Sequence, residues 1–201
     1  FNYPNANEDG KWNSDDVTHS VKLIHEFDDT LSGYISHSTG FKAISTNLGA
    51  NATVYAGQSM DPSIYFAQPE EAENIEVGFK KTFSNGYLNM SFFHMAVEGY
   101  QSNLFIGTGF NLVNIGEQTN KGIEIDSLFF LSENFVFTFA ASLIDATFND
   151  FKNGPCDRTF VPPASDDCPI INGGPARVKD FTGRTPSGVP ELAITVSGTY
   201  T

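Results

Sequence analysis

Three histidines near the start of the chain carry side chains of the type that binds transition metals. His19, His25 and His37 share one face if the segments around them form two paired strands, because side chains alternate between the faces of a strand. That face also carries the apolar residues Val21, Leu23 and Ile35. Because such a face is typical of contact with lipid or with another layer of protein, we predict no metal site here.

The acidic residues form two groups that differ in their surroundings. The first group lies in segments without strand periodicity and comprises Glu8, Asp9, Asp15, Asp16, Asp166 and Asp167. We interpret this group as solvated loop charge. The second group comprises Glu76, Glu124 and Asp126, which alternate with apolar residues, as does Lys80. Neither group is accompanied by a nucleophile or an activating environment, so we predict no catalytic residue, no cofactor and no enzymatic activity.

Cys156 and Cys168 are the only two cysteines. They lie in a segment rich in Pro, Asp and Gly, the loop between them is short, and no histidine stands at a metal-ligand spacing from them. We therefore predict a disulfide between them, as expected of a protein outside the reducing cytosol. Two free thiols in a cytosolic loop is the alternative.

The charge balance argues against two classes of partner. The 201 residues include 24 Asp and Glu against 11 Lys and Arg, which gives a formal net charge of -13. Binding to a nucleic-acid backbone or to an anionic membrane surface requires clustered Lys and Arg. The chain is also rich in Phe and Gly, with 19 and 18 residues, and this composition suits alternating strands better than apolar helices.

Period-2 alternation of apolar and polar residues predicts seven strands. We place them at about 17–27, 31–43, 73–83, 87–101, 117–131, 135–148 and 190–201. Consecutive strands are joined as hairpins by three short turn sequences, Asp28-Asp29-Thr30, Ser84-Asn85-Gly86 and Ser132-Glu133-Asn134. The hairpins are separated by long loops rich in Gly, Asn, Pro, Asp and Ser, at about 44–72, 102–116 and 149–189.

Connections that are alternately short and long predict an all-β, antiparallel transmembrane barrel, with tight periplasmic turns at one rim and long extracellular loops at the other. The predicted strands exceed the roughly 5–6 residues usual in globular domains and match the roughly 9–11 needed to cross a bilayer. Their polar face is mostly Ser, Thr, Ala, Gly and Asn, which suits a hydrated lumen. Glu76, Lys80, Glu124 and Asp126 are therefore predicted to face the lumen. A soluble all-β domain with the same alternation is the alternative.

Four stretches, in chain order, resemble the TonB-dependent outer-membrane receptors. STGFKA (38–43) resembles that family's strand end with an aromatic and a basic residue after Gly. PEEAENIEVGFKKTFSNGYLNMSFFHMAVEGYQ (69–101) resembles its PE…yElGlK segment, the following turn and a strand that ends in Asp-x-x-Gln. NLVNIGEQTNKGIEIDSLFFLSENFVFTFAASLIDATFNDF (111–151) resembles its N…G…GxE segment and the next hairpin, and GRTPSGVPELAITVSGTY (183–200) resembles a strand entered through Pro after a long loop.

The sequence departs from the family pattern in three ways. Glu98 stands where the family's strand end usually has Asp, and Ala43-Ile44-Ser45 replaces a Gly-rich continuation. The family's N-terminal plug domain and TonB-contacting segment have no counterpart in these residues. Members of the family have 22 strands around the plug, whereas about seven are predicted here, so we expect a segment from the later part of the barrel, in a mature or truncated chain.

The resemblance implies an active transporter in the outer membrane of a Gram-negative bacterium. Such receptors bind a scarce nutrient, a ferric siderophore, a saccharide or a cobalamin-like ligand, and import it with energy passed through TonB. The implied partners are outer-membrane lipid, the protein's own plug, TonB and the nutrient. The predicted ligand contacts are aromatic and amide residues of the long loops, Tyr55, Tyr65, Phe66, Asn103, Phe110 and Asn111. A passive porin and a soluble all-β binding module are the alternative functions.

Overall fold

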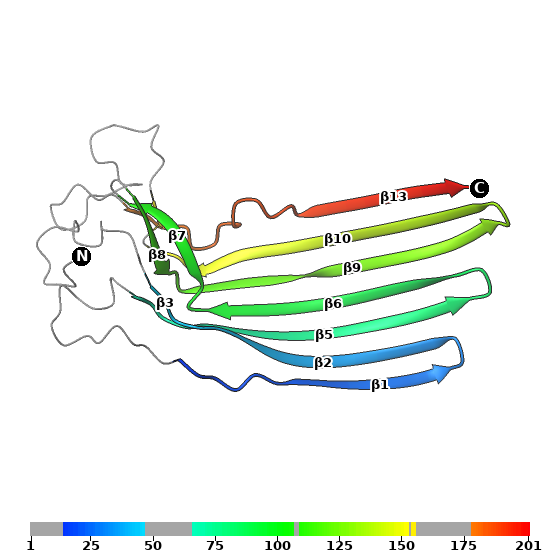
Figure 1. Cartoon of the computed structure of the whole chain (residues 1–201), viewed down its shortest axis with the longest axis horizontal. Coiled ribbons are helices and arrows are strands. Elements are labelled where there is room, and N and C mark those ends of the chain that lie inside the picture. The colour runs from blue at the N-terminus through cyan, green and yellow to red at the C-terminus, as the bar shows by residue number, and fades with distance from the viewer. Residues whose placement is uncertain (1–13, 47–65, 107–108, 153, 156–177) are drawn as a thin grey trace, which may run out of the picture.

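A computed structural model describes residues 14–46, 66–106, 109–152, 154–155 and 178–201. Its main element is a seven-stranded antiparallel sheet in which the strands lie side by side in chain order (Figure 1). The strands are β1 (Ser20–Asp28), β2 (Leu31–Lys42), β5 (Glu70–Phe83), β6 (Gly86–Glu98), β9 (Glu117–Ser132), β10 (Phe135–Asp150) and β13 (Leu192–Tyr200). The expected all-β, antiparallel class with about seven long strands is confirmed.

The three tight turns lie at one end of the sheet and the long connections at the other (Figure 1). The turn between β1 and β2 shows why the chain reverses there. Asp28 Oδ1 accepts hydrogen bonds from Thr30 N at 2.7 Å, Thr30 Oγ1 at 2.6 Å and Leu31 N at 2.9 Å. An Asp that bonds the backbone two and three residues ahead stabilises a turn locally, so this hairpin is specified by adjacent residues.

The strand register sorts side chains onto two faces of the sheet. Paired residues share a face, and one face, the apolar face, carries a continuous row across all seven strands. That row is Leu23, Ile35, Val77, Phe92, Ile123, Leu143 and Leu192. The opposite, polar face carries the row Glu26, Ser32, Lys80, Asn89, Asp126, Ala140 and Thr195. Leu23 is 69% exposed and Leu192 58% exposed, so no second layer of the described chain covers the apolar face.

The apolar face ends in aromatic residues on one side and in titratable residues on the other. Toward the turns it ends in aromatic residues, Phe27, Phe83, Phe129, Phe135 and Tyr200. Toward the long connections it ends in a row with titratable groups, His37, His94, Lys121 and Asp145. From Asp145 to Phe135 the strand advances about 33 Å at roughly 3.3 Å per residue, which is about 25 Å of height when a strand tilts by about 40°.

Cross-strand pairs of an aromatic residue and a glycine recur in the sheet. Gly78 pairs with Tyr34, Gly122 with Phe93 and Gly86 with Phe129. A Cβ at Gly86 would approach the Phe129 ring to 2.7 Å, and one at Gly122 would approach the Phe93 ring to 2.9 Å. At Gly78 the Tyr34 ring fills the space of a Cβ, whereas at Gly86 and Gly122 a Cβ would also meet a backbone carbonyl oxygen, that of Leu128 and that of Leu143, respectively.

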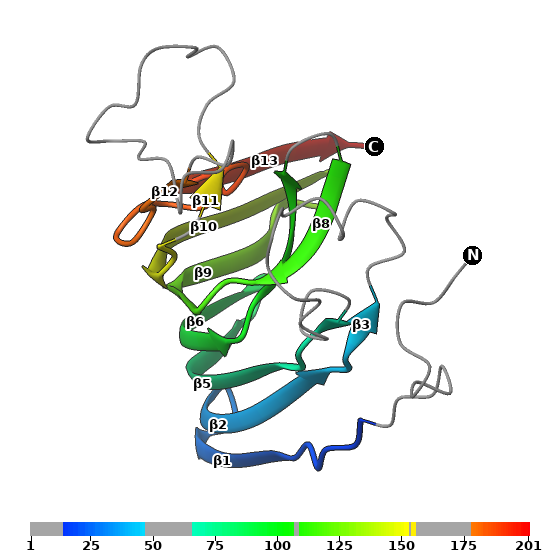
Figure 2. The same cartoon turned by 90° about the vertical axis from the view of Figure 1, so that its left-hand side faces the viewer.

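Short strands gather at the end of the sheet that carries the long connections, and Figure 2 shows them in front of the curved wall of long strands. They form three two-stranded pairs: β3 (Ser45–Thr46) with β4 (Phe66–Ala67), β7 (Gln101–Ile106) with β8 (Gly109–Asn114), and β11 (Gly154–Pro155) with β12 (Val178–Lys179). β4 contacts β8 and β7 contacts β11, so the β7–β8 hairpin touches the other two pairs. The bases of the three long connections therefore form one joined collar.

The collar changes two of the expected boundaries. The predicted strand 87–101 ends at Glu98, because Gly99 adopts a left-handed backbone with φ of 63° and the next residues turn into β7. The predicted loop 102–116 is mostly the β7–β8 hairpin. The other six long strands begin and end within about three residues of the predicted positions.

The buried residues of the described chain also lie mainly at this end. The buried apolar residues are Ala67, Val97, Ile115, Ala146 and Phe151. A single sheet has no opposing layer to bury its middle, so burial occurs where the collar folds back. In the described part of the chain, no helix is long and apolar enough to cross a membrane.

Candidate functional site

The residues predicted to face the lumen lie together on the polar face. Glu76 and Lys80 lie on the same face of β5, and Glu124 and Asp126 lie on the same face of β9. Asn89 of β6 lies between the two strands, pairs with Lys80 and Asp126 in register, and donates from Nδ2 to Asp126 Oδ2 at 3.1 Å. The four predicted residues thus share one surface, which carries more carboxylate than cation.

A second polar cluster on this face is centred on Tyr34, which the sequence analysis did not single out. The Tyr34 hydroxyl donates to Glu76 Oε1, and Lys22 Nζ lies 3.9 Å from the centroid of the Tyr34 ring. A cation over an aromatic face is attracted by the ring quadrupole. Gly78 lets the ring lie across β5, because a Cβ there would collide with Tyr34. The cluster therefore links β1, β2 and β5 through one aromatic side chain.

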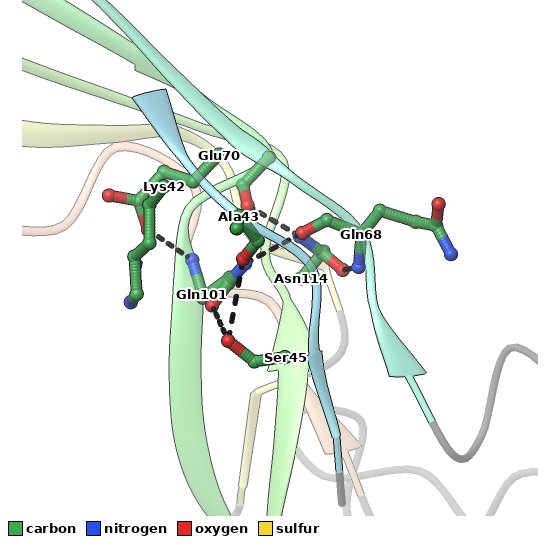
Figure 3. Close-up of polar contacts among 8 residues, drawn as sticks. Lys42, Ala43, Ser45, Gln68, Glu70, Gln101 and Asn114 are labelled. Atoms are coloured by element: carbon green, nitrogen blue, oxygen red, sulfur yellow. Dashed lines mark hydrogen bonds and ion pairs between the residues drawn. The ribbon is translucent and has the colours of Figure 1, made fainter. Parts of the chain in front are cut away.

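The base of the collar is held by a buried amide, Gln101 (Figure 3). Its side chain Nε2 donates to Ala43 O at 2.9 Å and to Gln68 O at 2.8 Å. Its Oε1 accepts from Ser45 Oγ at 3.0 Å, and its backbone N donates to Glu70 Oε2 at 2.8 Å. Gln101 is only 5% exposed, and buried polar groups are retained where they are satisfied in this way. It joins the ends of β2, β4 and β5 to the start of β7.

Asn114, at the end of β8, completes this cluster (Figure 3). Its Oδ1 accepts from Gln68 N at 2.6 Å, and its Nδ2 donates to Gln68 O at 2.9 Å and Gly99 O at 2.5 Å. Lys42 Nζ lies 3.6 Å from Glu70 Oε2, which adds one partly exposed ion pair at the rim. We call the set Gln101, Asn114, Ser45, Gln68 and Glu70 the loop-base node.

The other side of the β7–β8 hairpin is held by apolar contacts. Ile115 and Phe151 are buried at 5% and 7% exposure. The residues packed against them are Tyr100, Val113, Phe148 and Phe181. Phe181 belongs to the segment that returns toward β13, and its N donates to Phe151 O at 2.8 Å. This aromatic cluster thus joins the long connection after β6 to the one after β10. The loop-base node joins the long connection after β2 to the one after β6.

One carboxylate in the segment that returns toward β13 has a perturbed pKa. Hydrogen bonds from the side chain and the backbone of Thr182 hold the pKa of Asp180 below its ordinary value of 3.8. The Thr182 N to Asp180 Oδ1 distance is 2.8 Å, and Thr182 Oγ1 also accepts from Phe151 N at 3.0 Å. Thr182 therefore ties the return segment to the end of β10.

The predicted ligand contacts fall in different parts of the collar. Phe66 lies in β4, paired with Thr46, and Asn103 lies exposed in β7, paired with Leu112. Phe110 and Asn111 lie in β8. Tyr55 and Tyr65 lie outside the described residues. The structure thus brings Asn103, Phe110 and Asn111 into one hairpin and joins that hairpin to the strand that carries Phe66.

The predicted disulfide between Cys156 and Cys168 lies outside the described residues. Of the three histidines weighed as metal ligands, His25 packs edge-on against Phe27, with ring centroids 4.6 Å apart. His19 and His37 contact one another across β1 and β2. In the described ranges, no group of three or more His, Cys, Asp or Glu residues is arranged to hold a metal ion.

Comparison with known families identifies the chain. A family model described as TonB dependent receptor-like, beta-barrel, matches residues 1–201. The chain belongs to this family. Among curated proteins, the comparison found no match. The family is one of receptors and transporters rather than enzymes.

Solved structures show the same fold. The siderophore receptor PiuA from Acinetobacter baumannii matches with a TM-score of 0.61 at 18% identity, over 91% of this chain and 23% of that protein. The ferric yersiniabactin uptake receptor FyuA from Yersinia pestis matches with a TM-score of 0.59 at 14% identity, over 89% of this chain and 22% of that protein. The FrpB iron transporter from Neisseria meningitidis matches with a TM-score of 0.51 at 18% identity, over 69% of this chain and 21% of that protein. The chain therefore spans less than a quarter of the length of each.

Proposed function

We propose that this chain forms part of the wall and the loop base of an outer-membrane TonB-dependent transporter, and that its cargo is an iron chelate of the siderophore type. The observation that carries the proposal is the family match over the whole chain. The apolar face supports a membrane location, because its height of about 25 Å is that of the lipid-facing band of outer-membrane barrels. The location would be the outer membrane of a Gram-negative bacterium.

In this proposal the polar face is the lumen wall and meets a plug and passing cargo. Glu76, Lys80, Glu124 and Asp126 supply charge there, and Tyr34 supplies a rigid aromatic surface. Neither a plug nor TonB is part of the described sheet, so both are proposed partners in the complete receptor. The chain itself would perform no bond chemistry.

The collar would carry the ligand contacts. Loops on a rigid scaffold are where binding residues concentrate, and the loop-base node and the aromatic cluster supply that rigidity. Phe66, Asn103, Phe110 and Asn111 would contact the ligand, together with Tyr55 and Tyr65. The siderophore class is favoured because the similar structures include a siderophore receptor, a ferric yersiniabactin uptake receptor and an iron transporter.

The test is uptake by cells that express the complete receptor. We expect accumulation of radioactive iron from a panel of ferric siderophores, and we expect that accumulation to stop when TonB is deleted. TonB-dependent uptake of a saccharide or of a cobalamin instead would support the proposed transporter but contradict the proposed siderophore cargo. Diffusion of small solutes that does not depend on TonB would indicate a passive porin, and recovery of the protein outside the outer membrane would indicate a soluble module.

A further inference from the structure

Two histidines on the apolar face meet at the edge of the sheet that carries the collar. His19 immediately precedes β1, and His37 lies in β2. Thr39 N donates to His19 O at 2.9 Å, and His19 N donates to the side-chain Oγ1 of Thr39 at 3.1 Å, so one backbone bond and one bond to a side chain hold the two segments together. His19 Nε2 and His37 Nδ1 form a hydrogen bond at 3.1 Å, in which the tautomers decide the donor, and the ring centroids are 5.1 Å apart.

The nitrogens that point away from this contact also have oxygen partners. His37 Nε2 lies 2.7 Å from Glu73 Oε1 in β5, and His19 Nδ1 lies 3.3 Å from Thr39 Oγ1. Imidazoles that bind metal ions usually donate their second N–H to an oxygen acceptor, which fixes the tautomer and the ring orientation. Glu73 and Thr39 therefore stand where such supporting groups would be.

The distance between the facing nitrogens suits one ion bound to both. Imidazole nitrogens bind Zn²⁺ at about 2.0–2.1 Å, so two of them lie about 2.9 Å apart at a right angle and about 3.4 Å apart at a tetrahedral angle. The observed 3.1 Å falls between these values. Without an ion, one ring donates to the other across this distance. In the tautomers in which His37 donates from Nε2 to Glu73 and His19 donates from Nδ1 to Thr39, both facing nitrogens are acceptors, and an ion would take the place of the shared hydrogen.

We propose that His19 and His37 bind a divalent transition-metal ion on the outer wall of the receptor, with Glu73 and Thr39 as positioning residues. The order of stability for imidazole ligands favours Cu²⁺ over Ni²⁺ and Zn²⁺. The His37 side chain is 37% exposed and that of Glu73 is 60% exposed in this chain. His37 lies in the row that ends the apolar face toward the long connections, where the lipid-facing band gives way to the aqueous rim. The site lies on the opposite face from Glu76 and Glu124, so it is separate from the proposed path of cargo.

The pattern of residues in the sequence led us to predict no metal site on this face. Alternation placed three histidines on one face but gave no distances between them. Pairing of β1 with β2 brings His19 and His37 into contact and leaves His25 against Phe27. Two protein ligands hold an ion more weakly than the three or four of most zinc sites. The ion would therefore stabilise the pairing of β1 with β2, which forms without it.

The test is titration of the complete receptor in detergent with Cu²⁺ alone. We expect an electron paramagnetic resonance spectrum with hyperfine splitting from two nitrogens, and loss of that splitting in His19→Ala and in His37→Ala. His25→Ala is the matched control, because it removes an imidazole from the same face and should leave the spectrum unchanged. Glu73→Gln keeps both ligands and should weaken Cu²⁺ binding by about 10- to 100-fold.

Two results would overturn the proposal. One is a two-nitrogen spectrum that persists in His19→Ala, and the other is a spectrum that His25→Ala removes to the same extent. The heat-dependent gel mobility of folded outer-membrane barrels shows for each variant whether the fold is kept, and Glu73→Gln tests the site without removing a ligand. Iron uptake is measured separately, so failure of the metal site and failure of the proposed transport are distinguishable.

Discussion

At the scale of single residues, the polar face depends on a glycine. Tyr34 reaches Glu76 and receives Lys22 on its ring only because Gly78, in the neighbouring strand, leaves room for the ring. The alternation of residues predicted that Glu76 faces the lumen. It did not predict the role of Tyr34, because β2 and β5 are separated by a long connection and their register is not encoded in either strand alone.

Replacement of Gly78 by Ala should destabilise the receptor. The new Cβ would collide with the Tyr34 ring, and overpacking of this kind costs about 1–3 kcal/mol. Gly40→Ala is the control, since a Cβ there would lie 3.6 Å from Ala72 Cβ, an ordinary contact on the same face. The measurement is the urea midpoint of unfolding of the complete receptor from lipid vesicles. Equal midpoints for the two variants would contradict the packing described.

Asp180 should titrate below pH 3.8. Its charged form is favoured by the hydroxyl and the backbone N–H of Thr182, so Thr182→Val should raise the pKa of Asp180 toward 3.8, and Thr182→Ser should leave it low. Because the pKa is lower in the folded chain than in the unfolded chain, the carboxylate contributes stability above pH 3.8 and loses it as the pH falls through the folded value. Carboxyl carbon NMR with labelled Asp measures the shift, and an unchanged pKa in Thr182→Val would exclude the hydroxyl as its main cause.

At the scale of elements, the hairpin turns were predictable from the sequence, whereas contacts between distant segments were not. The hairpin turns follow from neighbouring residues such as Asp28 and Thr30, so the sequence was sufficient. The β7–β8 hairpin was assigned to a loop because β7 reads QSNLFI, three polar residues followed by three apolar ones, and so lacks the alternation of the long strands. The loop-base node was not predictable, because Gln101 bonds to carbonyls of Ala43 and Gln68, which any residue type would present.

Replacement of Gln101 by Ala should loosen the collar without unfolding the sheet. The change removes both donors to Ala43 O and Gln68 O and the acceptor for Ser45 Oγ. An unsatisfied buried polar group costs about 1–3 kcal/mol, so we expect amide hydrogen exchange in 43–46 and 66–70 to rise about tenfold or more.

The control for the collar is Ser102→Ala, in the next residue of β7, which leaves the loop-base node intact. Exchange within β9 and β10 should be the same in both variants and in the parent protein, because those strands are held by their own ladders. Faster exchange throughout the sheet in Gln101→Ala would show that the node supports the whole fold rather than the collar.

At the scale of the whole molecule, the sheet is incomplete on two edges and one face. β1 and β13 each pair on one side only among the described strands, and every residue of both strands is exposed. Unpaired edges invite association, and a closed barrel removes them. In the proposed outer-membrane receptor, further strands and lipid would supply the missing contacts. A membrane barrel was predictable from the sequence. The strands are long enough to cross a bilayer, and the connections are alternately short and long, as in transmembrane barrels.

Two adjacent alanines in β10 test the assignment of the faces. Ala141 lies on the apolar face near its mid-height, between Ile125 and Ile194, whereas Ala140 lies on the polar face between Asp126 and Thr195. A cation on the lipid side of a barrel costs about 2–4 kcal/mol at the bilayer midplane. We therefore expect Ala141→Arg to lower the free energy of unfolding from vesicles by about that amount. Ala140→Arg gains Asp126 as a neighbour and should change stability little, so a larger loss in Ala140→Arg than in Ala141→Arg would mean that the lumen and lipid faces are reversed.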